Sequence, residues 1–285
     1  MRNFLWMAGI ALPLMGQQFH IDHVTVAGRN VEAMRKALRE AAGIRSEYGG
    51  PHSNHATEMA LASFPDGSYL ELIAIQPKAD PAALAAHYWH KFLESDGGPC
   101  AWAIRPADFP AEVERLRKAG VEVTGPNKSG RKRPDGVQID WETAQVGPTN
   151  GGFFPFLIHD FTPRDNRAFP SGKPSTAEFT GIARVVVAVR NLDDAIARYR
   201  RAYGLEPSDT LVDPHFGAKL AIYPASPVVL AAPLSAASWL NSRLDRFGEA
   251  PCAFVLGKVS GSVRFEDISW LDSAQLGWRL GIAEP

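Results

Sequence analysis

The sequence has few of the features that mark several common classes of protein. Its 285 residues include only two cysteines, Cys100 and Cys252, and carry a formal net charge of −1. Two cysteines do not make a disulfide framework, and a nearly neutral chain lacks the basic stripe that neutralises nucleic-acid phosphates. We therefore expect buried structural thiols, with a disulfide as the alternative, and no nucleic-acid partner.

Motifs of the commonest catalytic classes are missing as well. The chain has no glycine-rich phosphate loop, no G-x-S-x-G nucleophile elbow and no paired C-x-x-C. These absences argue against a nucleotide-binding protein, a serine hydrolase and a zinc finger.

Hydrophobic runs are short. One covers residues 4–15, behind Arg2, and it is too short to span a bilayer but has the proportions of a signal-peptide core. We predict that residues 1–18 are a signal peptide and that the protein is exported; the alternative is a buried or frayed N-terminal helix in a cytoplasmic protein. We expect no membrane span in the rest of the chain.

The pattern of residues 19–75 predicts a strand, a helix and then further strands. Residues 20–27 alternate, which places Ile21, His23 and Thr25 on one face and the side chains between them on the other. Asn30 is a helix N-cap and Gly43 a helix stop. A loop at 49–54 and a Pro-Asp-Gly turn at 65–67 then separate the later strands.

This unit recurs along the chain. Residues 22–38 lie over residues 183–199 without a gap, and the fragments PCAW and PCAF place Cys100 and Cys252 at equivalent positions. We predict an α+β fold of four such units, the last one shortened. Two units form a domain at 19–165, a Pro- and Ser-rich linker covers 166–179, and a second domain covers 180–285.

Several motifs resemble the vicinal oxygen chelate superfamily and, within it, glyoxalase-like domain proteins. They are IDHV at 21–24, HSNHATEMAL at 52–61 and DGSYLELIAI at 66–75, with RKRPDG at 131–136 and FFPFLIHDF at 153–161 matching later signatures. The resemblance covers residues 19–170 well and the C-terminal third loosely. It implies paired βαβββ units that form cupped mixed sheets in two tandem domains, with a small-molecule site in each cup. Many members hold a divalent metal there, and others bind ligands without one.

The resemblance implies a metal-binding role for His23 and Glu71, which stand where the superfamily places a His on the first strand of a unit and a Glu on the last. Glu71 shares a strand face with Tyr69 and Ile73, and a buried carboxylate needs a partner. We expect His23, His55 and Glu71 to bind Zn, Fe, Mn or Ni, with His55 and Glu71 catalytic. The alternatives are a structural pair of Glu71 with a His or Arg, and a capping or substrate-binding role for His55. We expect the neighbouring His52 to be exposed.

The sequence departs from the superfamily pattern outside the first unit. Ala101 or Trp102 stands where a second His would lie, and Phe156 or Leu157 where a second Glu would lie. Arg184 replaces the His in the third unit. The second domain therefore reads as a degenerate copy that is either structural or binds anions.

Four further residues are candidates for substrate binding. They are Arg131, Arg133, Trp141 and His159. The two arginines would clamp a carboxylate or a phosphate, unless they lie in a solvated turn. Trp141 would line an apolar pocket, unless it is core, and His159 lies near the end of its strand.

Three functions fit these observations. The first is a metal-dependent enzyme, a lyase, isomerase or dioxygenase, that acts on a small oxygenated metabolite. The second is a metal-free protein of the same fold that sequesters a small molecule. The third is a structural protein of the cell envelope. A small molecule is the expected partner, and the expected assembly is a monomer or a homodimer.

Overall fold

The computed structural model describes residues 19–133, 135–148, 152–207, 209–223, 226–257, 264–271 and 276–283. The predicted signal peptide at 1–18 lies outside these ranges. Within them, no helix has both the length and the apolar character needed to cross a bilayer.

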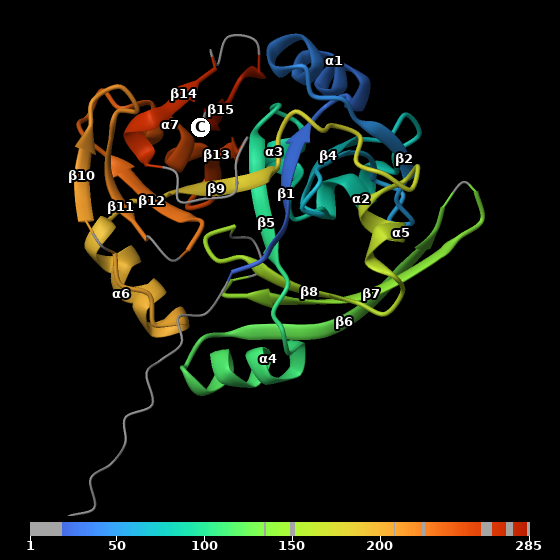
Figure 1. The fold of residues 1–285 in the computed structure, drawn as a ribbon, viewed down its shortest axis with the longest axis horizontal. Coiled ribbons are helices and arrows are strands. Elements are labelled where there is room, and N and C mark those ends of the chain that lie inside the picture. The colour runs from blue at the N-terminus through green and yellow to red at the C-terminus, as the bar shows by residue number, and fades with distance from the viewer. Residues whose placement is uncertain are drawn as a thin grey trace, which may run out of the picture.

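The first half of the chain forms one curled mixed sheet (Figure 1). Strands β1 and β5 pair antiparallel at its centre, and each also pairs in parallel with the last strand of its own unit. The strand order is β2-β3-β4-β1-β5-β8-β7-β6. The strands are β1 (Ile21–Gly28), β2 (Glu47–Pro51), β3 (Thr57–Ser63), β4 (Tyr69–Ile75), β5 (Gly98–Ile104), β6 (Val123–Lys132), β7 (Gln138–Val146) and β8 (Phe156–Asp160).

The second half builds a similar sheet around β9 and β13, with the order β10-β11-β12-β9-β13-β15-β14. Its strands are β9 (Gly181–Ala188), β10 (Asp209–Asp213), β11 (Ala218–Ile222), β12 (Val228–Pro233), β13 (Pro251–Gly257), β14 (Ile268–Trp270) and β15 (Arg279–Ala283). The 3₁₀ helix η1 (Phe265–Asp267) lies between β13 and β14. The predicted α+β fold of cupped mixed sheets in two tandem domains is therefore confirmed.

Local sequence signals explain where the helices begin and end. Asn30 accepts a hydrogen bond from the Ala33 N–H at the start of α1, and Asn191 does the same at the start of α6. Gly43 and Gly204 end these helices in the left-handed conformation, which glycine adopts without strain. The helices are α1 (Val31–Ala42), α2 (Pro81–Ala86), α3 (His90–Leu93), α4 (Phe109–Lys118), α5 (Arg164–Ala168), α6 (Leu192–Tyr203) and α7 (Trp239–Phe247).

Two segments differ from the sequence-based expectation. Residues 123–132 form strand β6, because they pair with β7 despite their exposed and polar character, so Arg131 does not lie in the solvated turn given as its alternative position. The start of the predicted linker is not extended either, since α5 folds against the first sheet and places Arg167 in its interior.

One large core joins the two sheets. It contains side chains from α1, α4 and α6 and from both sheets, such as Val24, Trp102 and Val185. Polar contacts cross the same boundary: the Tyr199 hydroxyl donates to the Phe153 carbonyl at 2.5 Å, and Arg115 donates to the Ala202 carbonyl at 2.7 Å. The two domains therefore pack as one body across their outer faces.

The inner faces of the two sheets differ in what fills them. The inner face of the second sheet is covered by its own apolar side chains, with Phe216 packed against Trp239, Phe265 and Trp270. The inner face of the first sheet divides into two smaller apolar groups with polar side chains between them. Only the first cup, among the described residues, is thus both open and polar.

The two cysteines lie at corresponding points of the two sheets. Cys100 on β5 is close to the Thr25 carbonyl, and Cys252 on β13 is close to the Val186 carbonyl. Both thiols are free and buried, and burial raises the pKa of Cys252 to about 12 and that of Cys100 well above its ordinary value. The prediction of buried structural thiols is confirmed.

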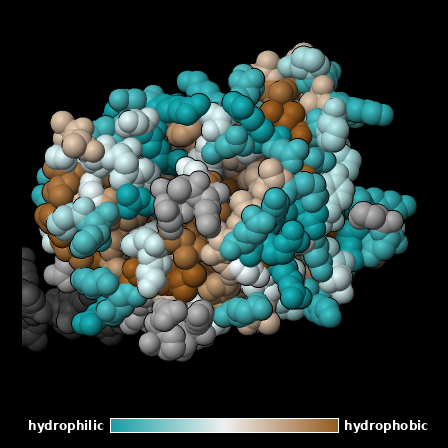
Figure 2. All heavy atoms as spheres, turned by 90° about the horizontal axis from the view of Figure 1, so that it is seen from above, coloured by the Kyte–Doolittle hydropathy of each residue, from teal (hydrophilic) through white to brown (hydrophobic). Residues whose placement is uncertain are grey.

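One face of the molecule is mixed in hydropathy (Figure 2). Hydrophilic residues cover most of the face shown in Figure 2, with smaller hydrophobic areas between them. The apolar side chains that determine the fold lie instead in the interior clusters described above.

Candidate active site

The first cup contains a cavity of about 320 Å³. Its floor is formed by His23 on β1 and by Tyr69, Glu71 and Ile73 on β4. The prediction that Tyr69, Glu71 and Ile73 share the face toward the cup is therefore confirmed. A cavity of this size accepts a small metabolite.

A β-bulge at Asp22 decides which side chains of β1 reach this cavity. In the pairing with β5, Ile21 lies opposite Ile104 and His23 lies opposite Ala103, so Asp22 is the extra residue. The prediction that Ile21 shares a face with His23 is wrong, because the bulge turns Ile21 into the core between the sheets. Asp22 instead lies beside His23, and its Oδ1 is 2.6 Å from His23 Nδ1.

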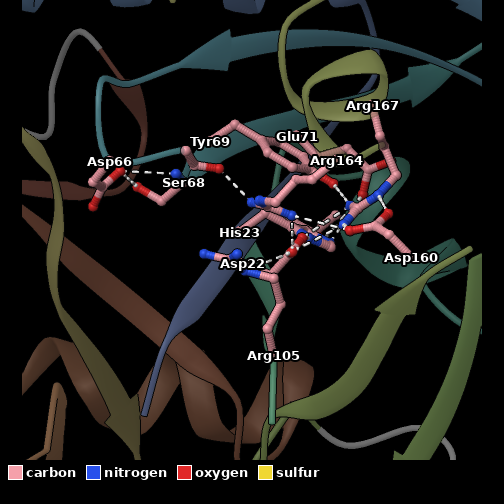
Figure 3. A network of polar contacts seen from close by, with 12 residues as sticks. Asp22, His23, Asp66, Ser68, Tyr69, Glu71, Arg105, Asp160, Arg164 and Arg167 are labelled. Atoms are coloured by element: carbon pink, nitrogen blue, oxygen red, sulfur yellow. Dashed lines mark hydrogen bonds and ion pairs between the residues drawn. The ribbon is translucent and has the colours of Figure 1, made fainter. Parts of the chain in front are cut away.

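Asp22 is the centre of a buried charged network (Figure 3). Arg167 donates to both of its oxygens at 2.9 Å, Arg164 donates to Oδ2, and Arg105 lies 3.4 Å from Oδ2. Asp160 is the second acceptor for Arg167, at 2.5 and 2.8 Å. Three guanidinium groups thus surround two carboxylates, and Asp22 is completely shielded from solvent.

The network fixes the charge of Asp22 and the orientation of His23. Although burial raises the pKa of Asp22, Arg167, the His23 hydrogen bond and Arg164 together hold that pKa well below its ordinary value. An ionised Asp22 accepts a hydrogen bond from Nδ1–H of His23, so Nε2 is left facing the cavity. The ring also stacks on Tyr69, with centroids 4.7 Å apart, and Arg167 donates to the Tyr69 hydroxyl.

Glu71 lies between two imidazoles. Its Oε2 is 3.7 Å from His23 Nε2 and accepts a hydrogen bond from the Thr25 hydroxyl at 3.2 Å. Its Oε1 is 3.8 Å from Nε2 of His52. The expectation that His52 is exposed is wrong: its side chain is 22% exposed and lines the cavity. Burial lowers the pKa of His52 although Glu71 opposes this, so its imidazole is neutral near pH 7.

We tested whether these groups form the metal site that the resemblance implies. A metal with imidazole and carboxylate ligands needs donors about 2.0–2.2 Å from one point. In the described parts of the chain, no three His, Cys, Asp or Glu side chains gather closely enough to hold an ion. His23 and His52 approach different oxygens of Glu71, and these residues therefore do not fit a centre with three protein ligands.

The structure brings together some of the predicted site residues and not others. His23, Glu71, Arg131 and Trp141 all line the cavity. His55 does not, because it is exposed in a left-handed conformation at the tip of its loop, with φ of 57°.

Arg133 and His159 also lie outside the cavity. Arg133 donates to Asp135 and to the carbonyls of Asn166 and Pro170, so it fastens the segment around α5 to the β6–β7 hairpin. His159 is exposed and contacts the rings of Phe109 and Phe161.

The cavity walls are largely apolar and its mouth is mixed. Met59, Leu61, Phe156 and Ile158 line the walls together with Trp141. The mouth carries His87, Tyr88 and Trp89: His87 stacks on Tyr88, and Tyr88 packs edge to face on Trp89. Trp102, one of the two residues at the place of a second His, lies in the core between the sheets.

Sequence reasoning missed the residues that support the imidazoles. Asp22 was placed on the opposite face of its strand, and Arg164 and Arg167 lay at or within the predicted linker. Two signals in the sequence point to them: an Asp directly before the candidate His, and two Arg three residues apart in a polar segment. Neither signal identifies its partner, because Asp22 and Arg167 are 145 residues apart.

Comparisons with known proteins agree with this architecture. A family model described as glyoxalase-like domain matches residues 21–199, and no curated protein matches the chain. A hypothetical protein from Staphylococcus aureus superposes with a TM-score of 0.62 at 14% identity, over 93% of this chain and 98% of that one. A mutant of 4-hydroxymandelate synthase from Streptomyces coelicolor gives 0.55 at 10% identity, over 85% of this chain and 71% of that one.

These likenesses to solved structures are at low identity and show the fold alone. The family model spans residues 21–199, which is more than half of the chain, and it includes both units of the first sheet. The chain therefore belongs to the glyoxalase-like domain family.

Proposed function

We propose that this protein is an enzyme that acts on a small oxygenated metabolite in the first cup, with Glu71 and His23 transferring a proton beside a carbonyl oxygen. One observation carries the proposal. A buried carboxylate holds one nitrogen of His23, and the other nitrogen faces a second carboxylate, 3.7 Å away, on the floor of an open cavity. Pairs of this kind serve general acid–base catalysis when a substrate enters between them.

The surroundings of the pair favour chemistry over simple packing. Asp22, Arg164 and Arg167 hold His23 in one orientation, which a proton-transfer step requires and a core imidazole does not. Val186 and Val229 stand in the second sheet where Thr25 and Glu71 stand in the first, and that cup is filled. The polar set is thus confined to the cup that has room for a ligand.

The step we propose is balanced within the substrate. Glu71 accepts a proton from the carbon next to a carbonyl, and the electron pair of that C–H bond forms the double bond of an enolate. Nε2 of His23 carries no proton while Nδ1–H is donated to Asp22, so it takes the abstracted proton from the Glu71 carboxyl group. The imidazolium so formed donates a hydrogen bond from Nε2 to the negative oxygen and then gives the proton back. Return of the proton to carbon completes an isomerisation or epimerisation, so no oxidant or reductant is needed.

Proton exchange provides the test. The purified protein is incubated in D₂O with a panel of α-hydroxy-carbonyl compounds and 2-oxo acids, and loss of the α-proton signal is followed by NMR. We expect exchange with at least one compound and a reduction of at least about 100-fold in Glu71→Gln, the low end of the effect of a general base. Glu114→Gln, which removes a carboxylate that is 60% exposed on α4, is the matched control and should exchange normally.

Other outcomes favour the alternatives. If a ligand binds without proton exchange and a chelator does not affect its binding, the protein is a metal-free protein that sequesters its ligand and not an enzyme. Stoichiometric metal in elemental analysis, with exchange lost on chelation and restored by the metal, would replace the proton-transfer pair with metal-dependent chemistry. Full exchange in Glu71→Gln would contradict the role given to that residue.

A further inference from the structure

Arg131 is a cation in the cavity with few partners. It lies on the edge strand β6, is half-buried, and lines the cavity. Its one hydrogen bond to a described residue runs from Nη1 to the Gly49 carbonyl at 3.4 Å. A guanidinium has five N–H donors, so most of those of Arg131 have no acceptor among the described residues.

The other arginines near the cavity are fully engaged. Arg167 also lines it, but Asp22, Asp160 and the Tyr69 hydroxyl take its donors. Arg133 has a carboxylate and two carbonyls as acceptors. In the described part of the chain, Arg131 is therefore the cavity-lining guanidinium with donors to spare for a ligand.

Arg131 is also kept apart from the carboxylate of the site. No ion pair between Arg131 and Glu71 is found among the described residues, and Glu71 instead contacts Thr25, His23 and His52. The cavity thus offers a positive group and a basic group at separate points. A ligand with an anionic end would be repelled by Glu71 and attracted by Arg131, which fixes the direction in which it lies.

We propose that the substrate is a monocarboxylate with an apolar, ring-sized body, and that Arg131 is its counter-charge. The inference rests on the proposed function and names the substrate class of the same site. The carboxylate matches the planar fork of a guanidinium. The body lies against Trp141 and Phe156, and the reacting carbon is presented to Glu71.

A dianion fits less well than a monocarboxylate. In the described ranges only one uncommitted guanidinium faces the cavity, and Glu71 is a further negative charge. Burial lowers the pKa of both His52 and His87. Neutral imidazoles do not supply a second positive charge. The existing bond of Arg131 to Gly49 is long, so a carboxylate displaces it with little loss.

Binding of two isosteric probes tests the proposal. Phenylacetate and phenylacetamide differ mainly in charge, and calorimetry measures the affinity of each without any turnover. We expect the wild-type protein to prefer phenylacetate about 10- to 100-fold, the range for hydrogen bonds to a charged group. Arg131→Gln should remove the preference and Arg131→Lys should restore part of it. Lys132→Gln removes a charge from the next residue, which is exposed, and should leave the preference intact.

Three results would overturn the inference: equal binding of the two probes by the wild-type protein, no binding of either probe, or a preference that survives in Arg131→Gln. Phenylphosphonate is included, and tighter binding of this dianion would contradict the assignment to a monocarboxylate. The proposed function fails independently of this experiment. If the protein exchanges the α-proton of a neutral carbonyl compound but does not prefer phenylacetate to phenylacetamide, the substrate class alone is refuted. If binding depends on Arg131 but no compound exchanges its α-proton, the enzyme activity alone is refuted.

Discussion

Replacing Asp22 by Asn would test the charged network that supports the candidate site. The substitution keeps the size of the side chain and removes one negative charge from a position with no solvent exposure. Among the described residues, Arg164 and Arg167 would then keep only Asp160 as a carboxylate partner, and Arg105 would lose its ion pair. The new amide N–H₂ would face other donors. Because breaking a buried ion pair leaves an uncompensated charge, we expect the free energy of unfolding to fall by about 3–5 kcal/mol.

The pH dependence of stability gives this prediction its sign. The pKa of Asp22 is lowered in the folded state, so the folded protein releases this proton more readily than the unfolded chain does. The resulting stabilisation is complete above the unfolded pKa of about 3.9 and is lost as the pH falls through the folded pKa. The difference between wild type and Asp22→Asn is therefore largest near neutrality and shrinks in acid.

Urea unfolding followed by tryptophan fluorescence, at several values of pH, measures both quantities. Asp245→Asn is the control, because Asp245 forms an ion pair with Arg190 in which the two side chains are 73% and 58% exposed. We expect this control to change stability by less than about 0.5 kcal/mol. A loss below about 1 kcal/mol in Asp22→Asn, or a difference that grows in acid, would show that the network does not hold the charge we assign to it.

Two further predictions concern the filled cup and the histidines. Phe216→Ala should lower the free energy of unfolding by about 3–5 kcal/mol, because Phe216 is fully buried in the second cup. The affinity for phenylacetate should not change. A large loss of that affinity would mean that the second cup takes part in binding. In an NMR titration, His52 should show a pKa below that of a free imidazole because of its burial. Glu71→Gln should lower this pKa further, because the Glu71 carboxylate attracts the protonated imidazole and so raises the pKa. An increase of the His52 pKa in Glu71→Gln would contradict the geometry of this pair.

Much of the fold could be predicted from the sequence because its signals are local. Asn30 and Asn191 cap their helices through side chains only three residues from the N–H groups they accept from. The alternation of Tyr69, Glu71 and Ile73 holds because β4 pairs with both neighbours without irregularity. Such features need no knowledge of the rest of the chain.

The site was less predictable because its geometry depends on distant partners. The bulge at Asp22 arises from the pairing of β1 with β5, which is distant in the sequence. It turns Ile21 to the face opposite to the one that strict alternation predicts. Residues in the His-bearing loop are equally hard to place. The backbone N–H of His52 donates to the Thr57 carbonyl, and the His52 ring contacts the Thr57 hydroxyl and lies near Glu71. His55 instead has a left-handed backbone conformation, and its side chain is exposed.

In the part of the chain that the structure describes, the second domain packs against the first and adds no side chain to the lining of the cavity. Arg184 occupies the place of His23, and the rest of that inner face is packed with apolar side chains. One group of its contacts with the first domain lies at the start of β5: Arg243 on α7 donates to the carbonyls of Gly97 and Pro99, and Phe247 stacks on Phe92 with centroids 4.2 Å apart. Strand β5 forms the bulge with β1 that places His23 in the cavity wall with Asp22 beside it. A second cup that is filled with its own side chains is therefore suited to hold β5 in register. This role does not require ligand-binding residues in the second cup.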